Sequence, residues 1–141
     1  MNTRTRREVG HAVVEATLLA PWIFFLFVGV LDFGFYAYAI ISTQNAARVA
    51  ALYTSANSLS VANQAVACTY ALDEMSSLPN VRSLSNCNSL PLIVTATAVT
   101  GPDGRPASQV AITYQTLPMI PMPGLTDRLQ ITRIAVMRVK R

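Results

Sequence analysis

The chain has 141 residues, with 11 lysines and arginines, seven acidic residues and a formal net charge of +4. Its charges lie mostly near the two ends, whereas nucleic-acid-binding proteins usually spread basic and aromatic residues over a folded face. The composition therefore argues against a nucleic-acid partner, and the length allows one small folded domain beside any membrane segment.

A long apolar segment follows a short basic leader. Residues 16–31 carry no charge and a single hydroxyl, that of Thr17, and the apolar character continues past Asp32 to Ile41. About 20 apolar residues are enough to cross the hydrocarbon core of a bilayer. Because arginines precede the segment, the positive-inside rule predicts a cytoplasmic N-terminus and an extracytoplasmic remainder.

A removable secretory signal is the competing interpretation, since residues 37–39 (AYA) fit a small-x-small cleavage site. The apolar core of such a signal is usually about 7–15 residues, which is shorter than the segment found here. Glu15 and Asp32 also lie within or beside the apolar segment, and a disposable signal does not need them. We therefore favour a retained membrane anchor.

The helical pattern predicts one helix over residues 11–55. Pro21 removes a backbone hydrogen bond inside it and predicts a kink, which membrane helices tolerate. Residues 42–53 keep good helix formers, and Val49, Leu52 and Tyr53 share one face at i, i+3, i+4 spacing. We expect that face to pack against the folded domain.

The remaining sequence predicts an α+β domain. Ser60 is the expected N-cap of a second helix that ends near Met75, and a Ser- and Asn-rich loop follows over residues 76–90. Three strands are expected over residues 93–99, 110–114 and 129–139, with a Gly/Pro turn joining the first two. We predict a three-stranded antiparallel meander with a helix across one face.

Three segments follow from these patterns: a basic leader over residues 1–10, a membrane helix with its extracytoplasmic extension over residues 11–55, and an extracytoplasmic domain over residues 56–141. Within the last, residues 117–125 (LPMIPMPGL) are apolar and broken by prolines. This segment either covers one end of the core or forms a contact surface for a bilayer or a neighbouring subunit; periodicity does not separate the two.

The only two cysteines, Cys68 and Cys87, lie in the extracytoplasmic part. A pair in an oxidising compartment predicts a disulfide, the alternative being two independent buried thiols. Their spacing is not that of a CxxC motif, and a single histidine, His11, leaves little for a metal site. We expect no metal and no cofactor.

Catalysis is not expected either. Asp73 and Glu74 are neighbours on a predicted helix, so their side chains point apart. The sequence contains neither a Gly-x-Ser-x-Gly motif nor a phosphate-binding loop. We expect neither an enzyme nor a small-molecule substrate.

The N-terminal third carries a recognisable pattern. Residues 10–15 (GHAVVE) look like the processing site of type IV prepilins, in which a glycine precedes the cut and a glutamate follows five residues into the mature chain. Together with residues 16–21 (ATLLAP), 29–34 (GVLDFG) and 44–53 (QNAARVAALY), they resemble the TadE-like pseudopilin family. The resemblance covers about residues 10–53.

This resemblance implies a minor pilin-like subunit of tight-adherence (Flp-type) pili. A membrane aspartyl prepilin peptidase would cut between Gly10 and His11. The chain would sit in the bacterial inner membrane, with other pilin-like subunits and a pilus assembly platform as partners. Four residues are then expected to pack against neighbouring helices: Pro21, Gly29, Asp32 and Gly34.

Glu15 is expected to set the register between subunits. Cleavage would give His11 a free amine, which is largely cationic near neutral pH. Glu15 lies four residues further on, about 6 Å along a helix axis. A subunit staggered by that distance would present its amine to this carboxylate in a low dielectric. The alternative is a weaker interaction of Glu15 with its own helix N-terminus.

Asp32 lies near the outer end of the apolar segment and has three possible roles. It can extend to the interface, pair with a helix of another pilin-like protein, or accept a hydrogen bond from Tyr36; we favour the helix contact.

A second class of function is an unprocessed, membrane-anchored protein that binds a partner. The mature N-terminus distinguishes the two classes: His11 supports a pilin and Met1 the anchor.

Overall fold

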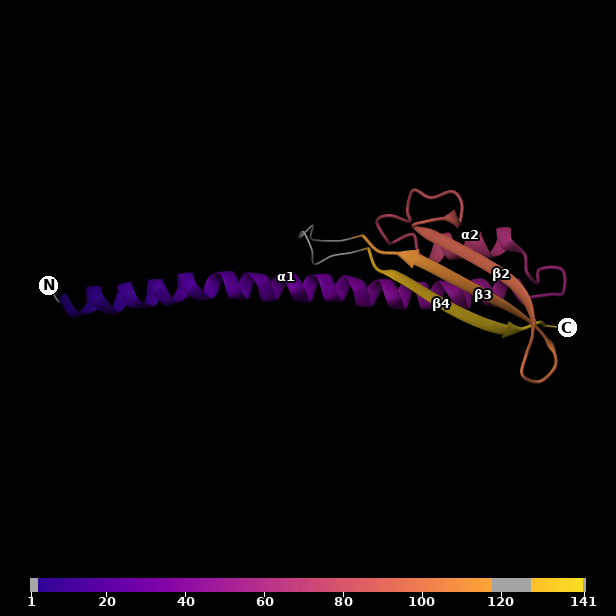
Figure 1. Ribbon diagram of the computed structural model, residues 1–141, viewed down its shortest axis with the longest axis horizontal. Coiled ribbons are helices and arrows are strands. Elements are labelled where there is room, and N and C mark those ends of the chain that lie inside the picture. The colour runs from indigo at the N-terminus through magenta and orange to yellow at the C-terminus, as the bar shows by residue number, and fades with distance from the viewer. Residues whose placement is uncertain (1–2, 118–127, 141) are drawn as a thin grey trace. The chain divides into compact units, whose positions relative to one another are not determined.

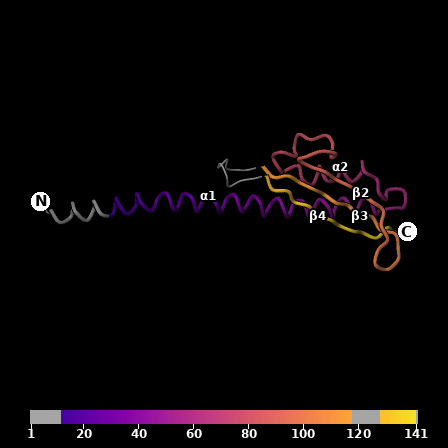
Figure 2. Tube along the Cα trace, viewed as in Figure 1, coloured from indigo at the N-terminus to yellow at the C-terminus, as the bar shows by residue number. Residues whose placement is uncertain are grey.

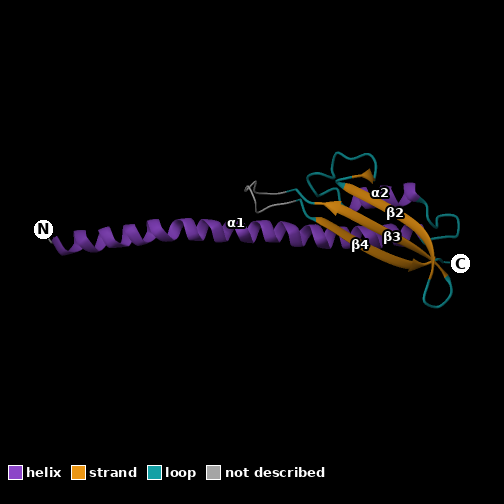
Figure 3. Ribbon diagram, viewed as in Figure 1, coloured by secondary structure: helices purple, strands orange, loops and turns teal. Residues whose placement is uncertain are grey.

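A computed structural model describes residues 3–117 and 128–140, with side chains from Ala12 onwards. Two helices and four strands follow in the order α1 (Thr3–Thr54), α2 (Gln64–Glu74), β1 (Asn88–Ser89), β2 (Leu92–Thr100), β3 (Pro106–Gln115) and β4 (Gln130–Arg138) (Figures 1 and 3). The chain divides into two compact units, Met1–Phe35 and Tyr36–Arg141, and α1 contributes to both. The fold is α+β, as predicted.

The sheet is an antiparallel meander in the order β1-β2-β3-β4. The prediction of three strands was wrong by one, because β1 pairs with β2 inside what we expected to be a loop. A two-residue strand is too short to show any periodicity in the sequence. The predicted pairing of the next two strands is confirmed, with Val94 opposite Ile112 and Thr100 opposite Pro106.

The turn between β2 and β3 depends on glycine. Gly104 has a φ of +74°, a conformation that other residues rarely adopt. Its N–H donates to the carbonyl of Gly101 at 2.9 Å. Asp103 in the same turn forms ion pairs with Arg105 at 3.7 Å and with Arg138 at 3.2 Å, so the turn is also tied to the end of β4.

The second helix begins later than predicted. Asn63 is its N-cap, and the Asn63 side chain accepts hydrogen bonds from the backbone N–H groups of Ala65 and Val66, both at 3.1 Å. Ser60 instead donates from its hydroxyl to the carbonyls of Thr54 and Asn57. Ser60 and Asn63 are both good caps by residue type, so only the path of the preceding loop decided between them.

One face of the sheet carries the core. Alternate side chains of β2 and β3 are buried, among them Leu92, Val94, Val110, Ile112 and Tyr114. The register places Ile131 and Ala135 of β4 on the same face, opposite Tyr114 and Val110. Figure 2 shows β2, β3 and β4 running side by side. The intervening residues, such as Thr95, Thr113 and Ile134, lie on the opposite, open face.

The last part of α1, within the Tyr36–Arg141 unit, buries a face made of small residues. Its fully buried members are Ala39, Thr43, Ala46, Ala47, Ala50, Ala51 and Thr54. The expected packing face of Val49, Leu52 and Tyr53 is confirmed in part, because the ring of Tyr53 stacks on that of Tyr70 in α2 with the ring centroids 3.6 Å apart, whereas Leu52 is 46% exposed. Small side chains let a helix backbone approach its neighbour closely, which larger ones prevent. A pattern based on apolar size therefore did not find the small-residue face, which is the fully buried one.

Polar contacts fix this part of α1 to the rest of its unit. The hydroxyls of Thr54 and Ser108 in β3 are 2.7 Å apart, and both residues are buried. The N–H of Lys140 donates to the carbonyl of Ser55 at 2.9 Å. Buried hydroxyls need such partners, because an unpaired one costs free energy. The end of α1 is therefore held at both the start of β3 and the end of the chain.

The predicted disulfide is confirmed. The sulfurs of Cys68 in α2 and Cys87 are 1.99 Å apart, and their Cα atoms are 5.7 Å apart. Closing a loop of this length stabilises a fold by about 3 kcal/mol in the chain-entropy model. The bond ties the loop that precedes β1 to α2. The predictions for residues 118–125 lie outside the described residues.

Candidate functional site

The first unit offers an apolar helix with no cover of its own. Every residue of α1 from Ala12 to Phe27 is exposed. Large apolar side chains lie on all sides of this helix, because residues 22–25 (WIFF) complete one turn and are each more than half exposed. Exposing such side chains to water is unfavourable, so the segment requires lipid or other helices around it.

Length and composition also fit a membrane span. The stretch Ala12–Thr54 contains a window with a mean hydropathy of 2.1, none of which is buried within the protein. Among the described residues, this is the one helix long and apolar enough to cross a bilayer. The protein therefore has a candidate membrane span near its N-terminus.

The predicted processing residues lie within continuous helix. Gly10 and His11 are both part of α1, which begins at Thr3. Glu15 is exposed and several turns beyond that start. The helix dipole acts mainly on charges in the first turn, so the intact chain offers Glu15 no N-terminus of its own to interact with.

Pro21 does not end the helix. α1 runs through it without interruption, although proline cannot donate to the carbonyl four residues earlier, which belongs to Thr17. The hydroxyl of Thr17 donates to the carbonyl of Val13 at 2.8 Å. A threonine can thus satisfy its own hydroxyl inside an apolar span without a partner from another chain.

Gly29, Asp32 and Gly34 belong to the last turns of the first unit. A Cβ atom built on either glycine meets no atom within 4 Å, so neither glycine is required by a close contact inside the chain. Within the described residues, Asp32 makes no side-chain hydrogen bond, and the bond to Tyr36 that we considered is not formed. Gly29, Asp32 and Gly34 therefore leave room for a neighbouring helix to pack beside them.

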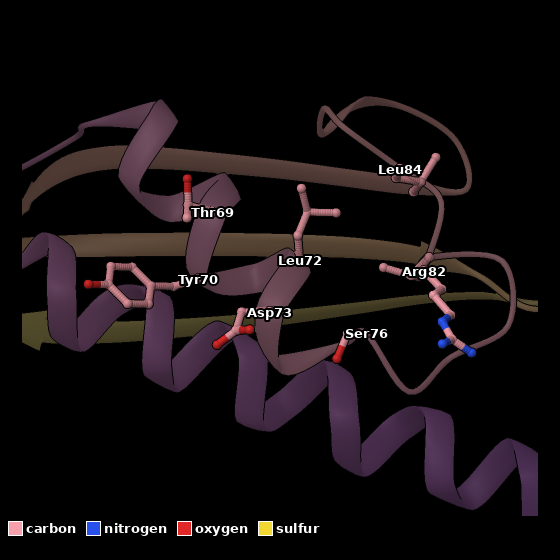
Figure 4. A pocket seen from close by; sticks show the side chains of 8 residues that line it. Thr69, Tyr70, Leu72, Asp73, Ser76, Arg82 and Leu84 are labelled. Carbon is pink, nitrogen blue, oxygen red and sulfur yellow. The ribbon is translucent and has the colours of Figure 1, made fainter.

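The Tyr36–Arg141 unit has open depressions beside α2. The one in Figure 4, of about 400 Å³, is lined by α2 and by the loop that follows it. Its polar side chains include Tyr70, Asp73 and Arg82. Among the residues that the structure describes, no group of three or more His, Cys, Asp or Glu side chains could hold a metal ion.

The buried Tyr114 forms a partly buried polar contact with Asn80 in this unit. Its hydroxyl donates to Oδ1 of Asn80 at 2.6 Å, and Nδ2 of Asn80 donates to the carbonyl of Gln115 at 2.8 Å. Burial raises the pKa of the Tyr114 phenol, and the hydrogen bond to Asn80 opposes part of that rise. The pair joins the loop after α2 to β3.

Replacing Tyr114 by phenylalanine is expected to lower the free energy of unfolding by about 1–2 kcal/mol at neutral pH, because Oδ1 of Asn80 loses its donor. The wild type should also lose stability as the pH rises past about 10, since the unfolded phenol ionises there while the buried one stays protonated. The Tyr114→Phe variant should lack this loss of stability at high pH, because it has no phenol at position 114. Thermal unfolding of both chains between about pH 7 and pH 11 measures the two effects.

The matched control is Tyr70→Phe, whose hydroxyl has no hydrogen-bond partner among the described side chains. We expect its stability at neutral pH to stay within about 0.5 kcal/mol of wild type. A Tyr114→Phe variant as stable as Tyr70→Phe would show that the contact with Asn80 contributes nothing.

Besides β1 and the N-cap of α2, two more features of the fold were not predicted from the sequence. The small-residue face of α1 has a visible signal, because four of its members recur at intervals of four: Ala39, Thr43, Ala47 and Ala51. The other is Gln64, whose side-chain amide bonds to the backbone of β2 at Val94 and Ala96. Nothing in the sequence distinguishes this glutamine from a solvent-exposed one.

Comparison with known protein families gives a match in the N-terminal part of the chain. Residues 10–52 match the family model described as TadE-like protein. This confirms the resemblance drawn from the sequence, over nearly the same residues. No curated protein and no solved structure matches the chain.

Proposed function

We propose that this chain, TadE-like over residues 10–52, is a minor pilin-like subunit that takes part in assembling a tight-adherence pilus. The observation that carries the proposal is a single helix, α1, that contains the matched residues, is apolar and exposed over residues 12–27, and continues into a small disulfide-linked unit. A structural subunit needs a helix that other helices can cover and a folded part that stays outside the membrane.

In this proposal a prepilin peptidase removes residues 1–10 at the inner membrane. The new amine of His11 then pairs with Glu15 of a neighbouring pilin-like subunit. An unpaired carboxylate is costly in lipid, and Glu15 has no partner in the first unit among the described side chains. The leader would therefore act as a removable block on the amine. The C-terminal unit lies on the extracytoplasmic side.

The mature N-terminus tests this function. We expect the chain isolated from its native host, or from membranes that contain a prepilin peptidase, to begin at His11. Replacing Gly10 by leucine should leave the leader attached, because the peptidase needs a small residue before the cut. Mass spectrometry of the purified chain distinguishes the two forms.

Val9→Ala is the matched control, since it changes the neighbouring position and keeps the glycine. It should be processed like wild type. An intact Met1 in the native chain would contradict the proposal and support an unprocessed membrane-anchored protein that binds a partner.

A further inference from the structure

The two edges of the sheet differ in how many of their outward backbone groups already have hydrogen-bond partners. Beyond the two residues that pair with β1, strand β2 itself forms one edge of the sheet, and there the side-chain amide of Gln64 donates to the carbonyl of Val94 and accepts from the N–H of Ala96 at 2.9 Å. The N–H of Val94 donates to the carbonyl of Cys87 at 3.0 Å. The backbone groups that another strand would need are therefore already used along this stretch.

Within the described residues, the β4 edge leaves its outward backbone groups open except for the carbonyl of Thr132, which accepts from the guanidinium of Arg133. The carbonyl of Leu129 accepts from Thr116, and the N–H of Val139 donates to Pro106, so odd-numbered residues of β4 point their backbone groups toward β3. In an antiparallel pair the alternate residues point away, and these are Gln130, Thr132, Ile134, Val136 and Arg138. All five are exposed.

This open edge is also basic. Residues 128–140 contain Arg128, Arg133, Arg138 and Lys140 and no acidic residue. Arg138 is paired with Asp103. The guanidinium of Arg133 donates to the carbonyl of Thr132 at 3.0 Å, which places a cation directly at the edge. Beside it, Ile134 is 54% exposed and Val136 is 47% exposed.

We propose that the β4 edge binds an extended acidic segment of another protein by strand addition. Main-chain hydrogen bonds to the N–H of Thr132 and to the N–H and carbonyl groups of Ile134 and Val136 would hold the segment, as in other sheet-edge complexes. An acidic side chain would lie near Arg133, and apolar side chains would lie beside Ile134 and Val136 on the open face. The site lies in the Tyr36–Arg141 unit and does not depend on cleavage of the leader.

A second copy of this chain fits the edge less well. Pairing β4 with β4 would bring the arginines of both strands together, and like charges across a pair of strands are destabilising. Charges at a sheet edge also prevent unwanted pairing, which is consistent with an edge that accepts only a segment of opposite charge.

The test uses the full chain in detergent micelles and two peptides of about seven residues, a usual strand length. One peptide alternates valine and glutamate, and the other has lysine in place of glutamate. We expect the acidic peptide to bind at least about tenfold more tightly. Amide hydrogen exchange should slow at Thr132, Ile134 and Val136.

Three variants make the result specific. Arg133→Glu should reverse the preference between the peptides without removing any backbone group. Ile134→Pro should weaken binding about tenfold by removing an outward N–H, whereas Ala98→Pro, at the opposite edge, should leave affinity unchanged. Equal binding of the two peptides, or slowed exchange away from β4, would overturn the proposal.

Discussion

Replacing Ala47 by phenylalanine is expected to lower the free energy of unfolding of the Tyr36–Arg141 unit by about 3 kcal/mol. Ala47 is fully buried on the small-residue face of α1, between the equally buried Thr43 and Ala51. A phenyl ring there would force α1 away from its neighbours and strain the contact between Thr54 and Ser108. Thermal unfolding of the full chain in micelles, followed by circular dichroism, measures the change.

Asn45→Phe is the matched control, because Asn45 is exposed on the same stretch of helix. Its unfolding free energy should stay within about 0.5 kcal/mol of wild type. Equal destabilisation by the two substitutions would show that the small-residue face is not a close contact.

Replacing Glu15 by glutamine is expected to reduce association with other pilin-like subunits about tenfold or more. This expectation rests on the proposed pairing, in which the change keeps the shape of the side chain but leaves the amine of a neighbouring subunit without its counter-charge in a low dielectric. Co-purification of differently tagged subunits from native membranes measures the association.

A double variant separates this effect from others. In a Gly10→Leu background the leader stays attached and no amine is formed at His11, so Glu15→Gln should cause no further loss. An equal loss in both backgrounds would show that Glu15 acts without the amine, and the proposed pairing would be wrong.

The sequence was sufficient to predict a structural feature wherever the type of a residue alone limits the environment that the residue can occupy. A continuous apolar run predicts a membrane helix because a helix satisfies its own backbone hydrogen bonds in lipid. The two cysteines predicted their bond, and the β-branched runs around a Gly/Pro turn predicted β2 and β3. Each of these predictions depends on local chemistry.

Predictions failed where the local sequence favoured several positions, or several faces, about equally. Ser60 and Asn63 are both suitable caps, and the loop path selected Asn63. The residues of β1 have no strand pattern, yet β2 lies alongside and supplies their partners. Leu52 is larger than the alanines of α1, but the alanines are buried because they allow a closer approach.

The apolar helix, the match to the TadE-like model over residues 10–52 and the two cysteines of the disulfide all follow from the amino-acid sequence alone. The buried face of α1 and the open edge of the sheet follow instead from packing between segments far apart in the chain. The bond from Gln64 to β2 and the exposed edge of β4 are both results of long-range packing. Such contacts join residues far apart in the chain, so no local pattern of residues specifies them.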